Sequence, residues 1–419
     1  MLDRKKPPQF VQNKSFDLLI PEIQNLGKSG KFVCINSGEQ ELIRIELVFY
    51  AGRWHEKFPG ISHFTSTLLP KGTTRHTCSQ ITNTFDLYGV HLEIHPGFDF
   101  TTVSLIGLTK NIPLVLDLLI DVISDPIFPE NELQQAIEIF KQGLKINLEK
   151  TSFIASREFR KILFGQAHPY GYDIELSNLN NIHKNKLTQF HQSSFSDVNV
   201  FVSGKINDKT KTLIFDKLSQ LKSQTVNPIQ HNPSPSNTQE NHITKEGAVQ
   251  TSLRIGKLSI NRYHPDYPGL LLLNHLLGGF FGSRLMKNIR EEKGLTYGIH
   301  SSIHPLQHYS YLVIGADVNR ENKQLVISEI LNELNRFKNS TVTYEELELA
   351  RNHFIGSLQA EMSTPFAHAD KIKSMTLFNL PNNYYQQLFD SIFKITDHQI
   401  IELANQHLSE SQIHTVSIG

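Results

Sequence analysis

Three residues of one short segment have side chains that could bind a metal or move a proton. His63, Ser66 and Thr67 lie in the glycine-bounded, helix-like stretch from Gly60 to Gly72. Imidazole is a common metal ligand, whereas a neutral hydroxyl is a poor zinc ligand beside imidazole or carboxylate. Ser66 cannot act as a base near neutral pH without a base of its own. With His63 used as a metal ligand, the segment therefore offers no general base beside it.

Two residues of the second half could stabilise a developing negative charge. Arg290 and Tyr297 carry a guanidinium and a phenol O–H, which are donors of fixed geometry. Such donors, aimed at an oxyanion, contribute roughly 3 kcal/mol each to a transition state. Their spacing allows both to face one cleft. Taken singly, Arg290 could instead pair with Glu291 or Glu292 on a solvated face, and Tyr297 could be a core residue.

The segment around His63 resembles the zinc-binding helix of the insulinase and mitochondrial-processing-peptidase family, a family of zinc peptidases. There the pattern is Gly-x-x-His-Phe-x-Glu-His followed by Lys-Gly-Thr, in which both histidines hold zinc and the glutamate is the base. Here Ser66 replaces the glutamate and Thr67 replaces the second histidine. The matching residues are Gly60, His63, Phe64, Lys71, Gly72 and Thr73.

The third zinc ligand of that family, a glutamate on a later long helix, also has no counterpart. The matching region is Lys141-Gln142-Gly143-Leu144-Lys145, and Glu138 and Glu149 lie more than a helical turn outside it. A lone histidine such as His63 is more often packed or hydrogen-bonded than a ligand. The sequence therefore predicts that this chain holds no metal and binds no cofactor.

The residues from Gly278 to Tyr297 resemble the second domain of the same family, which has Ser-Arg-Leu, Arg-Glu and Gly-Leu-x-Tyr. The resemblance implies that Arg290 and Tyr297 reach a zinc site, orient the substrate carbonyl and stabilise its oxyanion. It assigns Arg284 a structural role. It also implies that the strand from Gly89 to Ile94, with His91, Leu92 and Glu93, is a sheet edge that pairs with an extended peptide. An ordinary strand with charged edge residues that prevent aggregation is an equal alternative.

Composition restricts the remaining function classes. The 419 residues contain 41 Lys+Arg and 41 Asp+Glu, so the charge excess typical of nucleic-acid binding is absent. Two cysteines are too few for a disulfide scaffold. No signal peptide or apolar run long enough to span a membrane is present, which predicts a cytoplasmic protein.

The order of the expected elements predicts an α+β fold of two homologous domains, each an antiparallel sheet with helices packed on it, that form half of a clamshell. The boundaries are an N-terminal arm (1–27), a first domain (28–222), a flexible exposed linker (223–245) and a second domain (246–419). Ser302-Ile303-His304-Pro305 echoes Glu93-Ile94-His95-Pro96, which supports a repeat. Leu42 to Tyr50 alternate as a half-buried strand, and Thr343 with Glu346 predicts a capping box.

Loss of the zinc motif together with retention of Arg290 and Tyr297 favours one function. The chain is predicted to be the non-metal subunit of a heterodimeric zinc endopeptidase, with zinc on the partner subunit and a peptide as substrate; a homodimer is also open. The alternative is an inactive homologue that acts as a structural, assembly or peptide-binding subunit. A hydrolase that uses Ser62 or Ser66 beside His63 is disfavoured, because no acid completes a triad.

Overall fold

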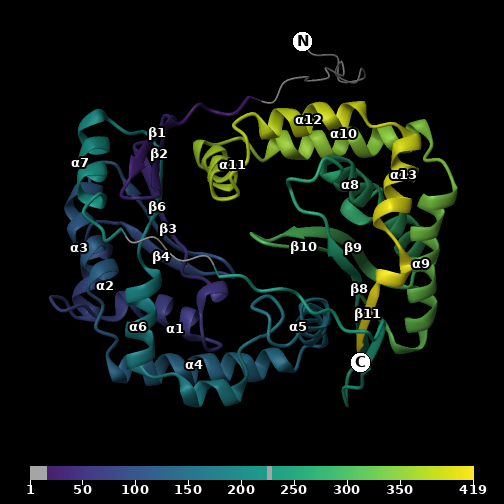
Figure 1. Cartoon of the computed structure of the whole chain (residues 1–419), viewed down its shortest axis with the longest axis horizontal. Coiled ribbons are helices and arrows are strands. Elements are labelled where there is room, and N and C mark those ends of the chain that lie inside the picture. The colour runs from purple at the N-terminus through teal and green to yellow at the C-terminus, as the bar shows by residue number, and fades with distance from the viewer. Residues whose placement is uncertain (1–16, 224–228) are drawn as a thin grey trace, which may run out of the picture.

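The computed structural model describes residues 17–223 and 229–419. It has two halves, each with one β-sheet and its own helices, which lie side by side (Figure 1). The first sheet has the strand order β1-β2-β6-β3-β5-β4, and the second has the order β7-β11-β8-β10-β9. The α+β class is confirmed. The strands are β1 (Glu22–Leu26), β2 (Gly30–Asn36), β3 (Leu42–Phe49), β4 (His91–Pro96), β5 (Thr101–Leu108), β6 (Asn199–Gly204), β7 (Glu240–Ile243), β8 (Gln250–Ser259), β9 (Thr296–Pro305), β10 (Ser310–Asn319) and β11 (His414–Ile418).

Helices cover both sheets. In the first half they are α1 (Ile61–Leu68), α2 (Cys78–Leu87), α3 (Ile112–Ser124), α4 (Glu130–Leu148), α5 (Thr151–Phe164), α6 (Lys184–Ser194) and α7 (Asp208–Leu218). In the second half they are α8 (Tyr267–Asn274), α9 (Lys323–Asn339), α10 (Tyr344–Ala360), α11 (Pro365–Leu377), α12 (Tyr384–Lys394) and α13 (Asp397–His407). Two π-helical segments, η4 (His275–Gly279) and η5 (Met286–Glu292), lie between α8 and β9, and a short 3-10 helix, η1 (Arg53–His55), precedes α1.

The two sheets repeat one topology. β2 pairs with β6 in parallel, as β7 pairs with β11, and the remaining pairs are antiparallel. The hairpins β4–β5 and β9–β10 occupy equivalent ends of the two sheets. The two similar Ile-His-Pro sequences end β4 and β9, so the predicted repeat has a structural counterpart.

Each half contributes one helix to the sheet of the other half. Helix α5 packs against β8 and β11, and α11 packs against β6 and β2 (Figure 1). One buried cluster accordingly joins Val33 and Phe201 of the first sheet to Ala369 and Ile372 of α11. Apolar residues of the two halves are therefore buried against one another at a contact that does not include the linker.

The strand β3 is covered on both faces rather than half-buried. The predicted inward residues, Ile43 and Ile45 among them, are buried, but Glu46 on the other face is only 6% exposed. There Lys373 of α11 donates to Glu46 at 2.6 Å, and Arg44 contacts Asp370 at 2.9 Å. Charged residues on that face therefore anchor α11 and do not mark a solvent face.

The linker and the N-terminal arm contain structure that the sequence did not predict. β1 lies within the predicted arm and β7 lies within the predicted linker. Ser234 and Ser236 also donate backbone hydrogen bonds to Phe164 and Ile162 of α5. The described part of the linker is mostly exposed, and backbone pairing with β11 attaches its residues 240–243 although the segment lacks apolar periodicity. Residues 1–16 and 224–228 lie outside the described residues.

We expect cleavage of the chain within the linker to leave the two halves associated. The reciprocal packing of α5 and α11 buries apolar surface that does not depend on linker continuity. Limited proteolysis followed by size exclusion under native conditions tests this, with a denaturing gel to confirm the cut. Separation of the two fragments on the column would contradict it, and first cuts within 90–140 would contradict the predicted domain boundary.

Candidate functional site

The segment with the incomplete zinc motif forms α1, whose start is fixed by a buried carboxylate. Gly60 adopts a left-handed conformation (φ 99°), and Glu56 accepts hydrogen bonds from the backbone N–H groups of Gly60 (3.2 Å) and Ser62 (2.8 Å). A carboxylate at a helix N-terminus satisfies donors that lack intrahelical partners. Tyr172 donates a third hydrogen bond to Glu56 at 2.9 Å, while burial raises the pKa of Glu56.

His63 is a packed aromatic residue in this structure. Its ring lies 5.0 Å from the ring of Phe140 and 5.1 Å from that of Phe64. Burial, with a smaller contribution from the positive charge of Arg53, lowers the pKa of His63 to about 4. His63 is therefore neutral near pH 7.

The two hydroxyls of the motif are engaged by the backbone. Ser66 Oγ donates to the carbonyl of Ser62 (2.7 Å) and lies 2.9 Å from Thr101 Oγ1, and Thr67 Oγ1 donates to the carbonyl of His63 (2.8 Å). These are i to i−4 hydrogen bonds typical of hydroxyl residues within a helix. Neither hydroxyl contacts the His63 ring in the described residues, so the structure assembles no serine nucleophile there.

A pocket of about 390 Å³ lies beside α1 where the family's zinc site is expected. Its carboxylate is Asp173, which forms ion pairs with Arg53 (3.3 Å) and Arg160 (2.6 Å). A neutral histidine with a carboxylate already held by guanidinium groups does not fit the three-ligand donor set of a catalytic zinc. The lining residues are Arg53, Ser62, His63, Pro96, Gly97, Phe98, Phe140, Gly143, Leu144, Asn147, Phe153, Arg157, Asp173 and Ile174.

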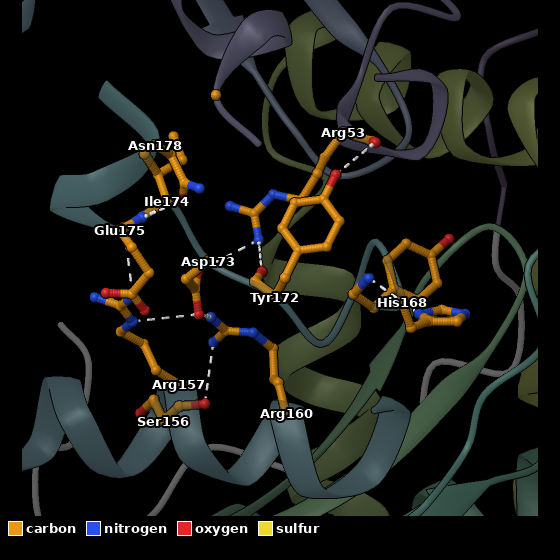
Figure 2. A network of polar contacts seen from close by, with 12 residues as sticks. Arg53, Ser156, Arg157, Arg160, His168, Tyr172, Asp173, Ile174, Glu175 and Asn178 are labelled. Atoms are coloured by element: carbon orange, nitrogen blue, oxygen red, sulfur yellow. Dashed lines mark hydrogen bonds and ion pairs between the residues drawn. The ribbon is translucent and has the colours of Figure 1, made fainter. Parts of the chain in front are cut away.

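The polar residues of this pocket were missed by sequence reasoning. Arg53 precedes α1, Arg157 belongs to α5, and Asp173 lies in the loop after α5; Figure 2 shows the three side chains converging. They come from three segments of the first half with no motif linking them, so only the fold brings them together.

We expect the isolated chain to bind no stoichiometric zinc at His63. Elemental analysis of protein prepared in metal-free buffer measures this directly, and near one zinc per chain that is lost in His63→Ala would contradict it. His264, Asp266 and His407 lie close enough together elsewhere to hold an ion. His264→Ala is therefore the control that separates zinc bound there from zinc bound at His63.

Arg290 and Tyr297 lie outside the pocket beside α1. Arg290, on η5, is half-buried, lies over the ring of Phe281 (4.8 Å to the centroid) and makes no ion pair within the described residues. Tyr297, at the start of β9, is 92% exposed, and its hydroxyl has no hydrogen-bond partner in the described part of the chain. Within the described residues, Arg290 therefore does not pair with Glu291 or Glu292, and Tyr297 is not a core residue.

Arg284 has a different environment, which supports its structural role. It makes a bidentate contact with Glu346 (2.6 and 2.9 Å) and lies over the ring of Phe337 (4.0 Å). Thr343 caps α10 by accepting from Glu346 N (3.2 Å), as expected. The predicted capping box is wrong, however, because the Glu346 carboxylate is used by Arg284 instead.

The strand β4 forms one edge of the first sheet. It pairs with β5 on one side and has no strand partner on the other within the described residues. His91 and Glu93 are exposed, Leu92 is half-buried, and Glu93 contacts His91 (2.8 Å) and His95 (3.0 Å). The open edge can accept an extended peptide through backbone hydrogen bonds, and its use for a substrate stays a prediction.

Comparisons with known proteins support the sequence resemblance. A family model described as Insulinase (Peptidase family M16) matches residues 31–160, and one described as Peptidase M16 inactive domain matches residues 181–354. The Bacillus subtilis protein named Uncharacterized zinc protease YmxG is 25% identical over 80% of this chain and 82% of its own length. Another Bacillus subtilis protein, named Probable inactive metalloprotease YmfF, is 26% identical over 43% of each chain.

Solved structures agree in fold. A peptidase M16 inactive domain from Pseudomonas fluorescens has a TM-score of 0.88 at 24% identity, covering 95% of this chain and 98% of that chain. A protease from Helicobacter pylori has a TM-score of 0.86 at 18% identity, covering 96% and 100%. No helix in the described residues combines the length and apolar character needed to cross a membrane.

Proposed function

Because this chain belongs to the insulinase, or M16, peptidase family and lacks its zinc motif, we propose that it is the zinc-free subunit of a heterodimeric zinc endopeptidase. The observation that carries the proposal is the contrast between two sets of family residues. The zinc-motif positions are occupied by a neutral packed histidine and backbone-bonded hydroxyls. Arg290 and Tyr297 are retained, and neither side chain has a hydrogen-bond partner among the described residues.

The surroundings of this pair favour a role toward another molecule. A tyrosine that is 92% exposed at the start of a strand gains little from packing, and a half-buried arginine held only over an exposed phenylalanine gains little from ion pairing. In the proposed complex, the partner chain supplies zinc and the general base. The Arg290 guanidinium and the Tyr297 hydroxyl donate hydrogen bonds to the substrate carbonyl oxygen as it becomes negative.

In the proposed complex, the peptide substrate pairs with the open edge of β4. Backbone pairing on a sheet edge holds an extended peptide with little dependence on its side chains. His91 and Glu93 would then contact alternate side chains, while Leu92 lies on the other face of the strand.

Mixing the two subunits tests this function. We expect the isolated chain to cleave no peptide, and a complex with an M16 chain that has an intact His-x-x-Glu-His motif to cleave peptides faster than that chain alone. A quenched fluorescent peptide measures both rates. If the two chains form a stable complex without any gain in turnover, the alternative of a structural or assembly subunit is favoured.

A further inference from the structure

We propose that the pocket left by the lost zinc site binds the carboxylate of a peptide. This arginine pocket consists of Arg53, Arg157 and Asp173 with the apolar walls Phe98 and Phe140. The inference takes from the proposed function only that the ligand is an extended peptide. It adds a preference for a negative charge at one position of that peptide.

The polar network around the pocket has more guanidinium groups than carboxylates. Arg53, Arg157 and Arg160 surround Asp173, and Glu175 is the second carboxylate that they contact (Figure 2). Glu175 has a side chain that is 60% exposed, so its charge is screened by solvent. The neighbouring Glu56 accepts hydrogen bonds from two backbone N–H groups and from Tyr172, so its oxygens are already engaged at the start of α1.

Arg53 has donors left for a ligand. Its Nη1 donates to the carbonyl of Tyr172 (2.6 Å) and contacts Asp173, while Nη2 and Nε have no hydrogen-bond partner among the described residues. The guanidinium is held over the ring of Phe98 at 4.8 Å and near that of Tyr172 at 5.5 Å. A guanidinium fixed in this way can donate to a carboxylate with little loss of side-chain freedom.

Arg157 adds a second guanidinium group to the lining of the pocket. It is 8% exposed, and its Nη1 is buried without a hydrogen-bond partner in the described part of the chain. Its Nη2 and Nε contact Glu175 (2.5 Å) and Asp173 (3.5 Å), so Nη1 is the donor of this guanidinium that remains unsatisfied among the described residues. His63, which also lines the pocket, adds no charge of its own near pH 7, since burial and the charge of Arg53 lower its pKa to about 4.

The position of the pocket identifies the ligand as part of a peptide. Pro96, the last residue of β4, and Gly97 and Phe98 that follow it all line the pocket. The backbone of η1 is attached there, because Arg53 N donates to Gly97 O (3.1 Å) and Trp54 N donates to Phe98 O (2.7 Å). A peptide paired on the edge of β4 would therefore extend one end toward the arginine pocket.

Binding of labelled peptides to the isolated full-length chain tests the inference by fluorescence anisotropy. The probes are short alanine–threonine peptides with a single glutamate, each compared with its glutamine counterpart, both amidated at the C-terminus. We expect the glutamate peptide to bind about 10-fold more tightly, because a charge-assisted hydrogen bond contributes on that order. A third probe, the glutamine peptide with a free C-terminal carboxylate, shows whether the carboxylate source is a side chain or the chain end.

Gly143 offers a matched pair of variants. It lies on α4 and lines the pocket, and a Cβ added there meets nothing within 4 Å. Gly143→Glu and Gly143→Gln have side chains of similar size. We expect Gly143→Glu to abolish the preference for a peptide carboxylate by pairing with the arginines, and Gly143→Gln to retain it. Arg53→Met should also lose the preference for the glutamate peptide over its glutamine counterpart.

Two results would overturn the inference. Equal affinity of the native chain for all three probes would do so, as would an unchanged carboxylate preference in Gly143→Glu. Thermal melting checks that each variant is folded, and the Gly143 pair decides the question even if Arg53→Met does not fold. The binding measurements use the isolated chain without a partner subunit. Equal affinity for the probes would therefore not contradict the proposed peptidase function, and a mixed complex without activity would not contradict a measured carboxylate preference.

Discussion

Arg290→Ala is expected to lower kcat of the mixed complex by about 100-fold to 1,000-fold with little change in KM, as is typical for removal of one oxyanion donor. The interaction strengthens as the carbonyl becomes an oxyanion, so its loss affects the transition state more than the bound substrate. Arg290 makes no ion pair within the described residues, so its removal should leave the fold intact. Steady-state kinetics on a complex reconstituted with saturating variant subunit measures the effect.

Two further variants separate chemistry from structure. Tyr297→Phe removes only an O–H and should produce a similar loss, and the double variant should fall short of the product of the two effects because both donors act on one oxygen. Arg284→Ala is the control, since Arg284 is held by Glu346 and Phe337. It should alter stability or assembly more than the chemical step. Unchanged turnover in Arg290→Ala would identify the chain as a scaffold.

Trp54→Ala is expected to lower the free energy of unfolding by about 3–5 kcal/mol, as for a large buried aromatic. Trp54 is 2% exposed, stacks on His308 of the β9–β10 turn at 3.8 Å, and donates from Nε1 to the carbonyl of Ile229 at 3.0 Å. His231 in turn contacts the Trp54 carbonyl at 3.1 Å. One side chain thus joins the first half, the linker and the second half.

Urea denaturation of the native chain and the variant measures this loss. Leu87, at the end of α2, is 77% exposed, and Leu87→Ala should change stability by no more than about 0.5 kcal/mol. A Trp54→Ala effect as small as that of the control would mean that this contact between the halves contributes little to folding.

Local sequence patterns were sufficient to predict several of the elements. The alternation of Ile43, Ile45 and Leu47 predicted β3, and Gly89, which adopts φ 58°, follows the helix that precedes β4, where a glycine is a common sequence signal for a helix end. The order of elements also predicted a repeated α+β unit. These features depend on short-range periodicity and on residues with special backbone preferences, which a single sequence carries.

Long-range packing could not be predicted in the same way. Helices α5 and α11 were not predicted, and no local pattern in either of them indicates that it packs on the sheet of the other half. Arg44 and Glu46 resembled solvent-facing residues because their partners, on α11, are more than 300 residues away in the sequence. The arginine pocket was missed for the same reason.

Purification of this chain from its native host most directly tests the claim that it is a zinc-free peptidase subunit. We expect an M16 chain with an intact His-x-x-Glu-His motif to copurify with it in equal amount, and we expect the complex to contain zinc and to cleave peptides. Recovery of this chain without such a partner, in an assembly that has no peptidase activity, would contradict the account and favour a structural role.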